Sequence, residues 1–265
     1  MHPYLIRTTH YVVSVYSICA VAALLLSGFL VCLRLKHEHR DFYSFIAILA
    51  VVYIGVFGGA YVAYLLFSYG IQNVIRDIRE GTWAFFRNGG LVFYGGLIGG
   101  IGMAFVGAKI ARVRLGDYVN AIVPVIPLAH GIGRIGCTFA GCCYGYDYEG
   151  PLHIFSVQRD QIAGIHGGAH IGTFPVQPLE AALNFVMAFV LWRVSKRMRP
   201  GSWTILYYYL IAYGVERFLL EFLRGDAIRG AFAGLSTSQW ISLALIAFGI
   251  LMLLRERRRN RFSAA

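Results

Sequence analysis

The feature that most constrains this chain is a series of seven long apolar segments separated by charged loops. They span residues 11–33, 42–69, 90–108, 118–140, 178–194, 203–223 and 239–254, to within a few residues. A helix needs about 20 apolar residues to cross a bilayer, and each segment comes close to or exceeds that length. The chain is 58% hydrophobic and only 14% charged, which leaves too little polar surface for a soluble domain. The sequence therefore predicts an all-α, seven-helix membrane protein that forms a single integral-membrane domain over residues 1–265.

The distribution of basic residues predicts the orientation of these helices. Fifteen arginines and lysines lie after the first, third, fifth and seventh segments, against seven in the other connections and the amino-terminal segment. Cytoplasmic loops of membrane proteins carry the excess of basic residues, so the amino terminus is predicted outside, on the periplasmic face, and the carboxyl terminus in the cytoplasm. The same rule accounts for the formal charge of +11, and we predict no nucleic-acid partner.

Two connections on the predicted outer side are expected to form structure of their own. Residues 71–88 place isoleucine and valine at helical spacing among charged residues, which predicts a helix lying in the membrane interface. Residues 144–177 form the longest loop, rich in glycine and histidine, and are predicted to be an external subdomain. The first apolar run is too long for a cleaved signal sequence and is predicted to be a retained span.

The stretch from His130 to Gly145 carries an unusual set of polar groups for so apolar a chain. His130 and Arg134 are four residues apart, so on a helix they share one face. Buried cations in a membrane are costly and usually functional. Three cysteines follow, at positions 137, 142 and 143. Their spacing differs from the usual zinc pairing C-x₂-C, so packing cysteines are favoured over a disulfide or a metal site, and neither a metal nor a cofactor is predicted.

A second polar group lies in the sixth apolar segment. Arg217, Glu221 and Arg224 are spaced to form one stripe on a helix. Such a stripe is either a self-neutralising network or a clamp for a lipid phosphate, because guanidinium groups bind phosphate with two parallel hydrogen bonds.

Two further blocks of the sequence complete the set of candidate site residues. Tyr94, Gly95 and Gly96 begin a glycine-rich segment typical of close helix packing, and Gln177 and Glu180 begin the fifth segment, where an acidic residue suits the helix dipole.

These four blocks together resemble the prolipoprotein diacylglyceryl transferase family. The resemblance runs from Tyr16 to Asp226 and rests on the arginine motifs around Arg134 and Arg217. It implies a bacterial inner-membrane enzyme whose active site faces the outer leaflet. It also implies transfer of the diacylglyceryl group of phosphatidylglycerol to the cysteine thiol near the signal peptide of a prolipoprotein, the first step of lipoprotein maturation.

The resemblance also assigns roles to residues of this chain. Arg134, Arg217, Glu221, Tyr94 and Tyr16 correspond to catalytic positions. The phospholipid-binding positions correspond to Arg134, Arg224, Gly95, Gly96, Gly145, Gln177, Glu180 and His130. The chain departs from the family pattern at Tyr94, Cys137, Ala140, Cys142 and Phe174, where the family commonly has histidine, amide or carboxylate side chains.

Three other functions remain open from the residues alone. A transporter would also explain buried charges, although the chain has no duplicated halves. A related lipid-modifying enzyme would act on a different acceptor. A thiol redox protein would use the three cysteines, although C-x-x-C is missing.

Overall fold

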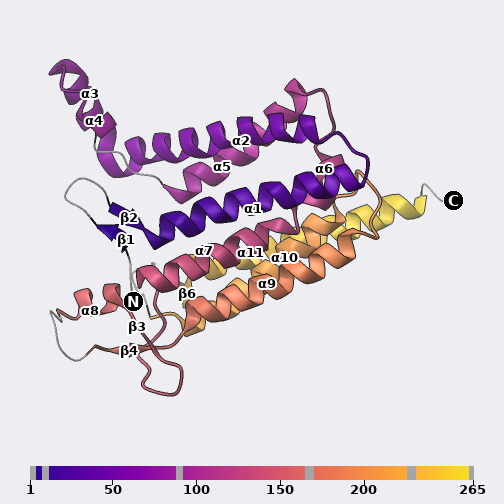
Figure 1. Ribbon diagram of the computed structural model, residues 1–265. Coiled ribbons are helices and arrows are strands. Elements are labelled where there is room, and N and C mark those ends of the chain that lie inside the picture. The colour runs from indigo at the N-terminus through magenta and orange to yellow at the C-terminus, as the bar shows by residue number, and fades with distance from the viewer. Residues whose placement is uncertain (1–3, 8–11, 88–91, 165–169, 226–230, 263–265) are drawn as a thin grey trace. The chain divides into compact units, whose positions relative to one another are not determined.

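The computed structural model describes residues 4–7, 12–87, 92–164, 170–225 and 231–262. Asn88, residues 90–91 and residues 165–169, which belong to segments predicted above, lie outside the described residues. The chain divides into two compact units, one formed by Met1–Val31 with Val119–Ala265 and the other by Cys32–Tyr118. Almost all of the regular structure in both is helical (Figure 1), as the composition predicts.

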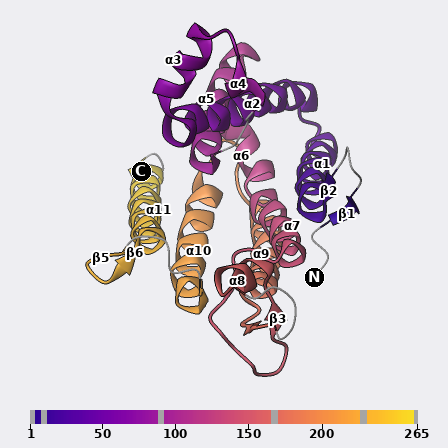
Figure 2. The ribbon, with the colours of Figure 1, turned by 90° about the vertical axis from the view of Figure 1, so that its left-hand side faces the viewer.

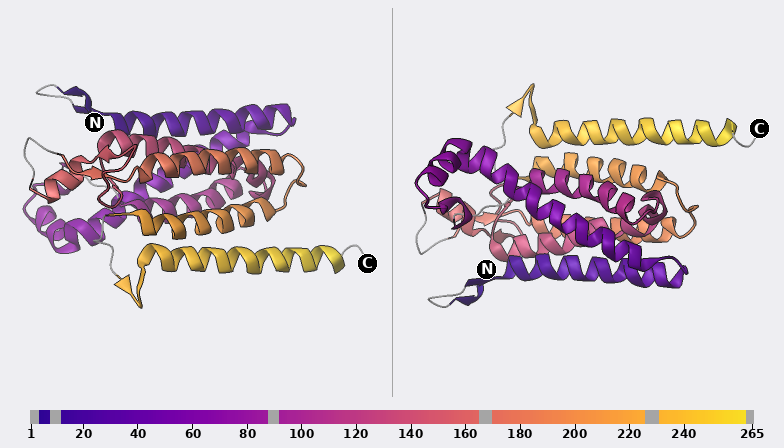
Figure 3. Two further views of the ribbon diagram at one scale, coloured as in Figure 1. Left: turned by 90° about the horizontal axis from the view of Figure 1, so that it is seen from below. Right: turned by 90° about the horizontal axis from the view of Figure 1, so that it is seen from above.

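The first unit contains most of the long helices. They are α1 (Val15–His37, which continues into the second unit), α6 (Gly116–Ile122), α7 (Val125–Ala140), α8 (Val157–Ile162), α9 (Val176–Ser195), α10 (Thr204–Leu220), the 3₁₀ turn η2 (Glu221–Leu223) and α11 (Thr237–Phe262). Helix α9 packs against both α7 and α10, and α11 runs alongside α10 (Figures 2 and 3). Val119, Val123, Leu191 and Ile205 form a buried apolar cluster at one end of this bundle. The polar residues predicted to be functional lie toward the other end.

The second unit is built on two closely packed helices. Its elements are α2 (Phe42–Ala63), the π-helix η1 (Tyr64–Gly70), α3 (Ile71–Arg79), α4 (Ala84–Arg87) and α5 (Phe93–Ile110). A methyl group on Gly99 would lie 2.1 Å from the Gly55 carbonyl oxygen, and one on Gly59 would lie 2.4 Å from that of Gly95. Only glycine allows two backbones to approach this closely, so these glycines fix the α2–α5 contact.

All seven predicted apolar segments are helical over most of their described lengths, but fewer meet the length and polarity expected of a membrane span. Within the described residues, four helices are long and apolar enough to cross a membrane. A fifth candidate is the pair α6 and α7, which bends by 40° where one continuous span was expected over 118–140. Pro124 and Pro127 explain the break, since proline removes a helix hydrogen bond and clashes with the preceding turn. The fold is thus that of a multi-pass helical protein, and the count of seven spans stays a prediction.

The sequence placed Arg217, Glu221 and Arg224 on one helical stripe, and this expectation is wrong for Arg224. Helix α10 ends at Leu220, η2 follows, and Arg224 has an extended backbone. The Gly225 backbone N–H donates to the Tyr144 carbonyl at 3.1 Å, so the chain leaves the helix to pair with the loop after α7. Tertiary pairing therefore overrides the helical periodicity here.

Short strands also interrupt the predicted all-α fold. They form three antiparallel pairs: β1 (Tyr4–Arg7) with β2 (Val12–Ser14), β3 (Ile154–Phe155) with β4 (Gly172–Thr173), and β5 (Ala231–Phe232) with β6 (Leu235–Ser236). The pair β3–β4 and helix α8 lie in the long loop predicted as an external subdomain. In this loop Arg159 donates to both oxygens of Asp147, at 2.8 and 2.7 Å.

This ion pair predicts a small dependence of stability on pH. The hydrogen bond from Arg159, together with its charge, holds the pKa of Asp147 below its usual value. A carboxyl group whose pKa is depressed by folding contributes stability above its unfolded pKa, about 3.9, and loses it as the pH falls further. The pair is exposed, so Asp147→Asn should lower stability by less than about 1 kcal/mol at pH 7. Thermal unfolding should show that the stability difference between the wild-type chain and Asp147→Asn disappears as the pH falls from about 4 to about 2, because the carboxyl group becomes protonated there. A stability difference that grows toward low pH would contradict this prediction.

Candidate active site

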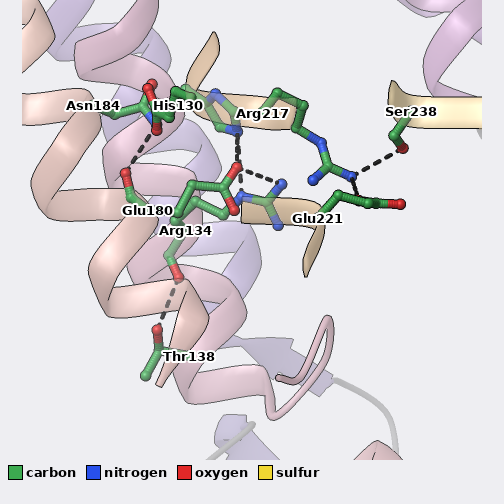
Figure 4. Close-up of polar contacts among 9 residues, drawn as sticks. His130, Arg134, Thr138, Glu180, Asn184, Arg217, Glu221 and Ser238 are labelled. Carbon is green, nitrogen blue, oxygen red and sulfur yellow. Dashed lines mark hydrogen bonds and ion pairs between the residues drawn. The ribbon is translucent and has the colours of Figure 1, made fainter. Parts of the chain in front are cut away.

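Three helices of the first unit turn polar side chains toward one another. Helix α7 carries His130 and Arg134 one turn apart, α9 carries Glu180, and α10 carries Glu216 and Arg217. Side chains four residues apart lie on the same face of a helix, as His130 and Arg134 do on α7, Glu180 and Asn184 on α9, and Arg217 and Glu221 at the end of α10, so each helix presents a polar stripe within an otherwise apolar sequence. Figure 4 shows these stripes meeting between the helices.

Glu180 is the centre of the contact between α7 and α9. It is only 1% exposed, and its Oε1 lies 3.0 Å from Arg134 Nη2 and 3.5 Å from His130 Nε2 (Figure 4). Arg134 Nε also donates to His130 Nε2 at 3.2 Å, which occupies the lone pair of that nitrogen. Glu180 is therefore more than an acidic residue suited to a helix dipole: it pairs with the partly buried Arg134 of α7 and orients its guanidinium.

Arg217 has a different set of partners from Arg134. Its Nη2 lies 2.7 Å from Glu221 Oε2 and donates to Ser238 Oγ of α11 at 3.0 Å (Figure 4). The i, i+4 spacing of Arg217 and Glu221 predicted this pair. Arg217 is 8% exposed, and its buried Nη1 has no hydrogen-bond acceptor among the described residues. A buried donor without an acceptor is costly, so this nitrogen is suited to bind an anionic ligand.

Three members of this polar group, Asn184, Glu216 and Ser238, were not predicted from the sequence. Asn184 Nδ2 donates to Glu216 Oε1 at 2.7 Å and to the Glu180 carbonyl at 2.9 Å. Asn184 is fully buried, and Glu216 is 9% exposed. Two signals were present in the sequence: Glu216 is a carboxylate inside an apolar segment, and Asn184 follows Glu180 by one helical turn. Nothing in the sequence pointed to Ser238.

Gly145 and Arg224, which are far apart in the chain, lie side by side in the structure. They form an antiparallel bridge, and the Tyr146 N–H donates to the Leu223 carbonyl at 3.1 Å. A methyl group on Gly145 would lie 2.4 Å from the Phe174 carbonyl oxygen. Close backbone packing therefore explains the glycine, and this packing fixes the segment that carries Arg224.

Gly145→Ala is expected to disturb this packing. A contact of 2.4 Å with backbone cannot be relieved by a side-chain rotation, so the two loop segments must separate. Overpacking of this kind costs about 1–3 kcal/mol. Thermal unfolding in detergent should show the loss, with Gly133→Ala as the matched control because a methyl group there meets nothing within 4 Å. Equal stability of the two variants would contradict the prediction.

The remaining predicted residues fall into two groups. Tyr16 on α1 lies against Gly136 of α7, so close that a methyl group on Gly136 would lie 3.2 Å from the Tyr16 ring. Gln177 is fully buried, and its Nε2 donates to the Cys142 carbonyl at 2.8 Å. Tyr94 and Gly95 belong to the second unit. Gly95 packs against Gly59 of α2, as Gly96 does against Val56 and Ala60, and Tyr94 is 57% exposed.

Comparison with protein families shows which family this chain belongs to. Residues 3–255, nearly the whole chain, match the family described as "Prolipoprotein diacylglyceryl transferase". The chain belongs to the prolipoprotein diacylglyceryl transferase family. This confirms the resemblance noted from the four sequence blocks.

Individual relatives carry the same name. Phosphatidylglycerol--prolipoprotein diacylglyceryl transferase of Clostridium tetani is 32% identical over 234 residues, which cover 85% of this chain and 87% of that protein. The enzyme of the same name from Streptococcus suis is 31% identical over 250 residues, which cover 92% and 88%. Phosphatidylglycerol--prolipoprotein diacylglyceryl transferase 2 of Clostridium perfringens is 32% identical over 212 residues, which cover 78% of this chain and 77% of that protein. The chain is thus similar to members of the diacylglyceryl transferase family over 77–88% of their length.

Proposed function

We propose that this family member transfers the diacylglyceryl group of phosphatidylglycerol to the cysteine thiol of a prolipoprotein, the first step of lipoprotein maturation. Membership of the family and the names of the relatives support the reaction and both substrates. The structural observation that carries the proposal is the pair of arginines in one polar cluster, the partly buried Arg134 on α7 and the buried Arg217 on α10. One of them, Arg217, keeps a buried N–H donor without an acceptor among the described residues.

The reaction needs a group that stabilises the leaving phosphate. A thiolate attacks the glyceryl carbon, the carbon–oxygen bond breaks, and glycerol phosphate departs with the electron pair. Negative charge builds on the phosphate oxygens, and guanidinium groups bind such oxygens with charge-assisted hydrogen bonds. Arg217 has the free donor for this contact, and Arg134 is held in the same polar cluster by Glu180.

The neighbouring residues position these two arginines. Glu180 and Glu221 offset their charge before substrate binds and fix their orientation, which reduces the reorganisation required during reaction. His130 contributes to the same positioning, because its Nε2 already accepts from Arg134. Arg224, Gly145, Gln177, Tyr16, Tyr94, Gly95 and Gly96 stay predicted substrate-binding or catalytic positions on the basis of the family resemblance.

The proposal includes the topology inferred from charge. Seven spans, an external amino terminus and a cytoplasmic carboxyl terminus would place the end of the bundle that carries Gly145 and α8 on the outer face of the inner membrane. Lipid substrate and the signal-peptide region of the prolipoprotein would then meet at the outer leaflet. The segment 71–88 would lie in the interface, where its exposed Ile71, Ile75 and Ile78 would contact lipid.

The decisive experiment is complementation of a bacterium depleted of its own diacylglyceryl transferase. Expression of this chain should restore the diacylglyceryl modification of prolipoproteins, read by mass spectrometry of the modified cysteine. The same cells should show no modification with an empty vector. A well-expressed chain that restores no modification would overturn the proposal. Modification of a different thiol would point to a related enzyme with another acceptor, and solute flux without modification would point to the transporter.

A further inference from the structure

Three cysteines converge beside the arginine site. Cys137 ends the polar stripe of α7, one turn beyond Arg134, and Cys142 and Cys143 lie in the turn that follows. Their three sulfur atoms all lie within 4.8 Å of one another, and all three thiols are free. Cys137 is buried and the other two are partly buried. The spacing C-x₄-C-C gave no sign of this convergence, which depends on how the chain turns after the helix.

The turn that brings the sulfurs together is held by its surroundings. Gly141 has a left-handed backbone with φ 67°, and Cys143 follows with φ 58°. The Cys142 carbonyl accepts from Gln177 Nε2 at 2.8 Å, and the Cys143 N–H donates to Gln158 Oε1 at 3.2 Å. A left-handed backbone at a non-glycine residue is strained, and it persists only where neighbours enforce it. Two side chains from other elements thus fix the positions of Cys142 and Cys143.

The geometry and chemistry of the cluster fit a zinc ion. Zinc binds thiolate sulfur at about 2.3 Å, so three sulfurs around one ion lie about 3.8 Å apart in a tetrahedral arrangement. Sulfurs already within 4.8 Å of one another need only small shifts to reach that spacing. Among the described residues, no histidine, carboxylate or fourth cysteine joins the group. Three protein ligands and an open fourth position are the pattern of catalytic zinc.

We propose that Cys137, Cys142 and Cys143 bind one Zn²⁺ whose fourth position takes the acceptor cysteine of the prolipoprotein. The inference rests on the proposed function, because it assigns the thiol substrate to a place beside Arg134. Coordination to zinc deprotonates a thiol outright, and the thiolate is the nucleophilic form. Zinc therefore supplies the activated nucleophile on one side of a site whose arginines stabilise the leaving group on the other.

The resulting step balances without a redox change. The zinc-bound sulfur forms a bond to the glyceryl carbon, and the bond from that carbon to the phosphate oxygen breaks. Glycerol phosphate leaves with the electron pair as a phosphomonoester dianion, and this dianion takes up the proton that the thiol lost when it bound zinc. The thioether product is a neutral, weaker ligand and leaves the zinc. The zinc is then again bound by its three cysteines, with its fourth position open.

The first test measures metal content. The full-length chain is purified in detergent without chelators, and zinc is measured by elemental mass spectrometry. We expect about one zinc per chain, because three thiolates and one open position form a single site. The variant with Cys137→Ser, Cys142→Ser and Cys143→Ser should contain almost none. The matched control replaces Cys19 and Cys32, the two other cysteines, and should keep its zinc. Substitution with Co²⁺ should give thiolate-to-cobalt absorption in the wild-type chain and the control only.

The second test separates this inference from the proposed function. The triple serine variant should lose transfer activity by about 10²-fold or more, the range for lost activation of a nucleophile, while the Cys19/Cys32 variant keeps it. A triple variant that is zinc-free and fully active would overturn the zinc inference and leave the transferase standing. A wild-type chain that binds zinc but modifies no prolipoprotein would overturn the transferase, and with it the role of the fourth position. A disulfide among the three cysteines in the purified chain, shown by thiol counting, would also overturn the zinc site.

Discussion

Replacing Arg217 by alanine is expected to lower the rate of diacylglyceryl transfer by about 10²–10³-fold, the effect of losing one preorganised donor to a developing anion. Arg217 is buried, it is held by Glu221 and Ser238, and its Nη1 has no acceptor among the described residues. The measurement is turnover with phosphatidylglycerol vesicles and a peptide that carries the acceptor cysteine. The alanine variant also leaves Glu221 without its cation, so folding must be measured in parallel.

Arg217→Lys separates catalysis from folding. Lysine keeps a positive charge for Glu221 but lacks the planar fork that binds two phosphate oxygens at once. This variant should be folded and still lose at least about tenfold in rate, equal to one charge-assisted hydrogen bond of about 1.5 kcal/mol. Arg193→Ala is the matched control, because Arg193 is an exposed arginine of α9 that stacks over Phe189. Full activity of Arg217→Lys would show that charge alone suffices and that bidentate binding plays no part.

Glu180→Ala is expected to destabilise the first unit by up to about 3 kcal/mol, since removing the buried carboxylate leaves the partly buried guanidinium of Arg134 without its counter-charge. Glu180 is 1% exposed, and it lies against both Arg134 and His130. Thermal unfolding in detergent should show this loss, and Glu149→Ala, which changes an exposed glutamate of the loop, should show almost none.

A paired replacement distinguishes charge from packing at this position. The double variant Arg134→Met and Glu180→Leu removes both charges and keeps the volume, so it should recover most of the stability lost in Glu180→Ala. It should remain inactive, because the proposed phosphate donor on α7 is gone. A double variant as unstable as Glu180→Ala would mean that Glu180 acts through its other contacts, such as the one with His130.

The convergence of the three cysteine sulfurs could not be predicted from the sequence. A spacing rule for zinc sites compares distances along the chain, and C-x₄-C-C matches none of the usual patterns. In the structure the turn after α7 reverses through Gly141 and Cys143, and this reversal returns Cys142 and Cys143 to the end of the helix that carries Cys137. Gln177 and Gln158 hold that turn from elements 15 to 35 residues away in sequence, as the hydrogen bonds record.

Local periodicity determined much of the site. The four-residue spacing of His130 and Arg134 predicted a shared face, and the same spacing predicted the Arg217–Glu221 pair; both contacts are present. It failed at Arg224, where an approach of the chain to Gly145 ends the helical run. The geometry of a helix is the same at every residue, so contacts within one helix can be predicted from residue spacing. The residue at which a helix ends depends instead on other chain segments that compete for its backbone hydrogen bonds.

By itself, the sequence determined that this is a helical membrane protein, which follows from composition and from apolar run length. Motifs that each lie within one segment carried the resemblance to the diacylglyceryl transferase family, and that resemblance implied the roles of Arg134 and Arg217. Only the tertiary structure decided that Glu180 pairs with Arg134, that Asn184 binds Glu216 and that three sulfurs share one place. The physical reason is that these contacts join different helices and turns, and their energies depend on distances in space that no spacing along one helix encodes.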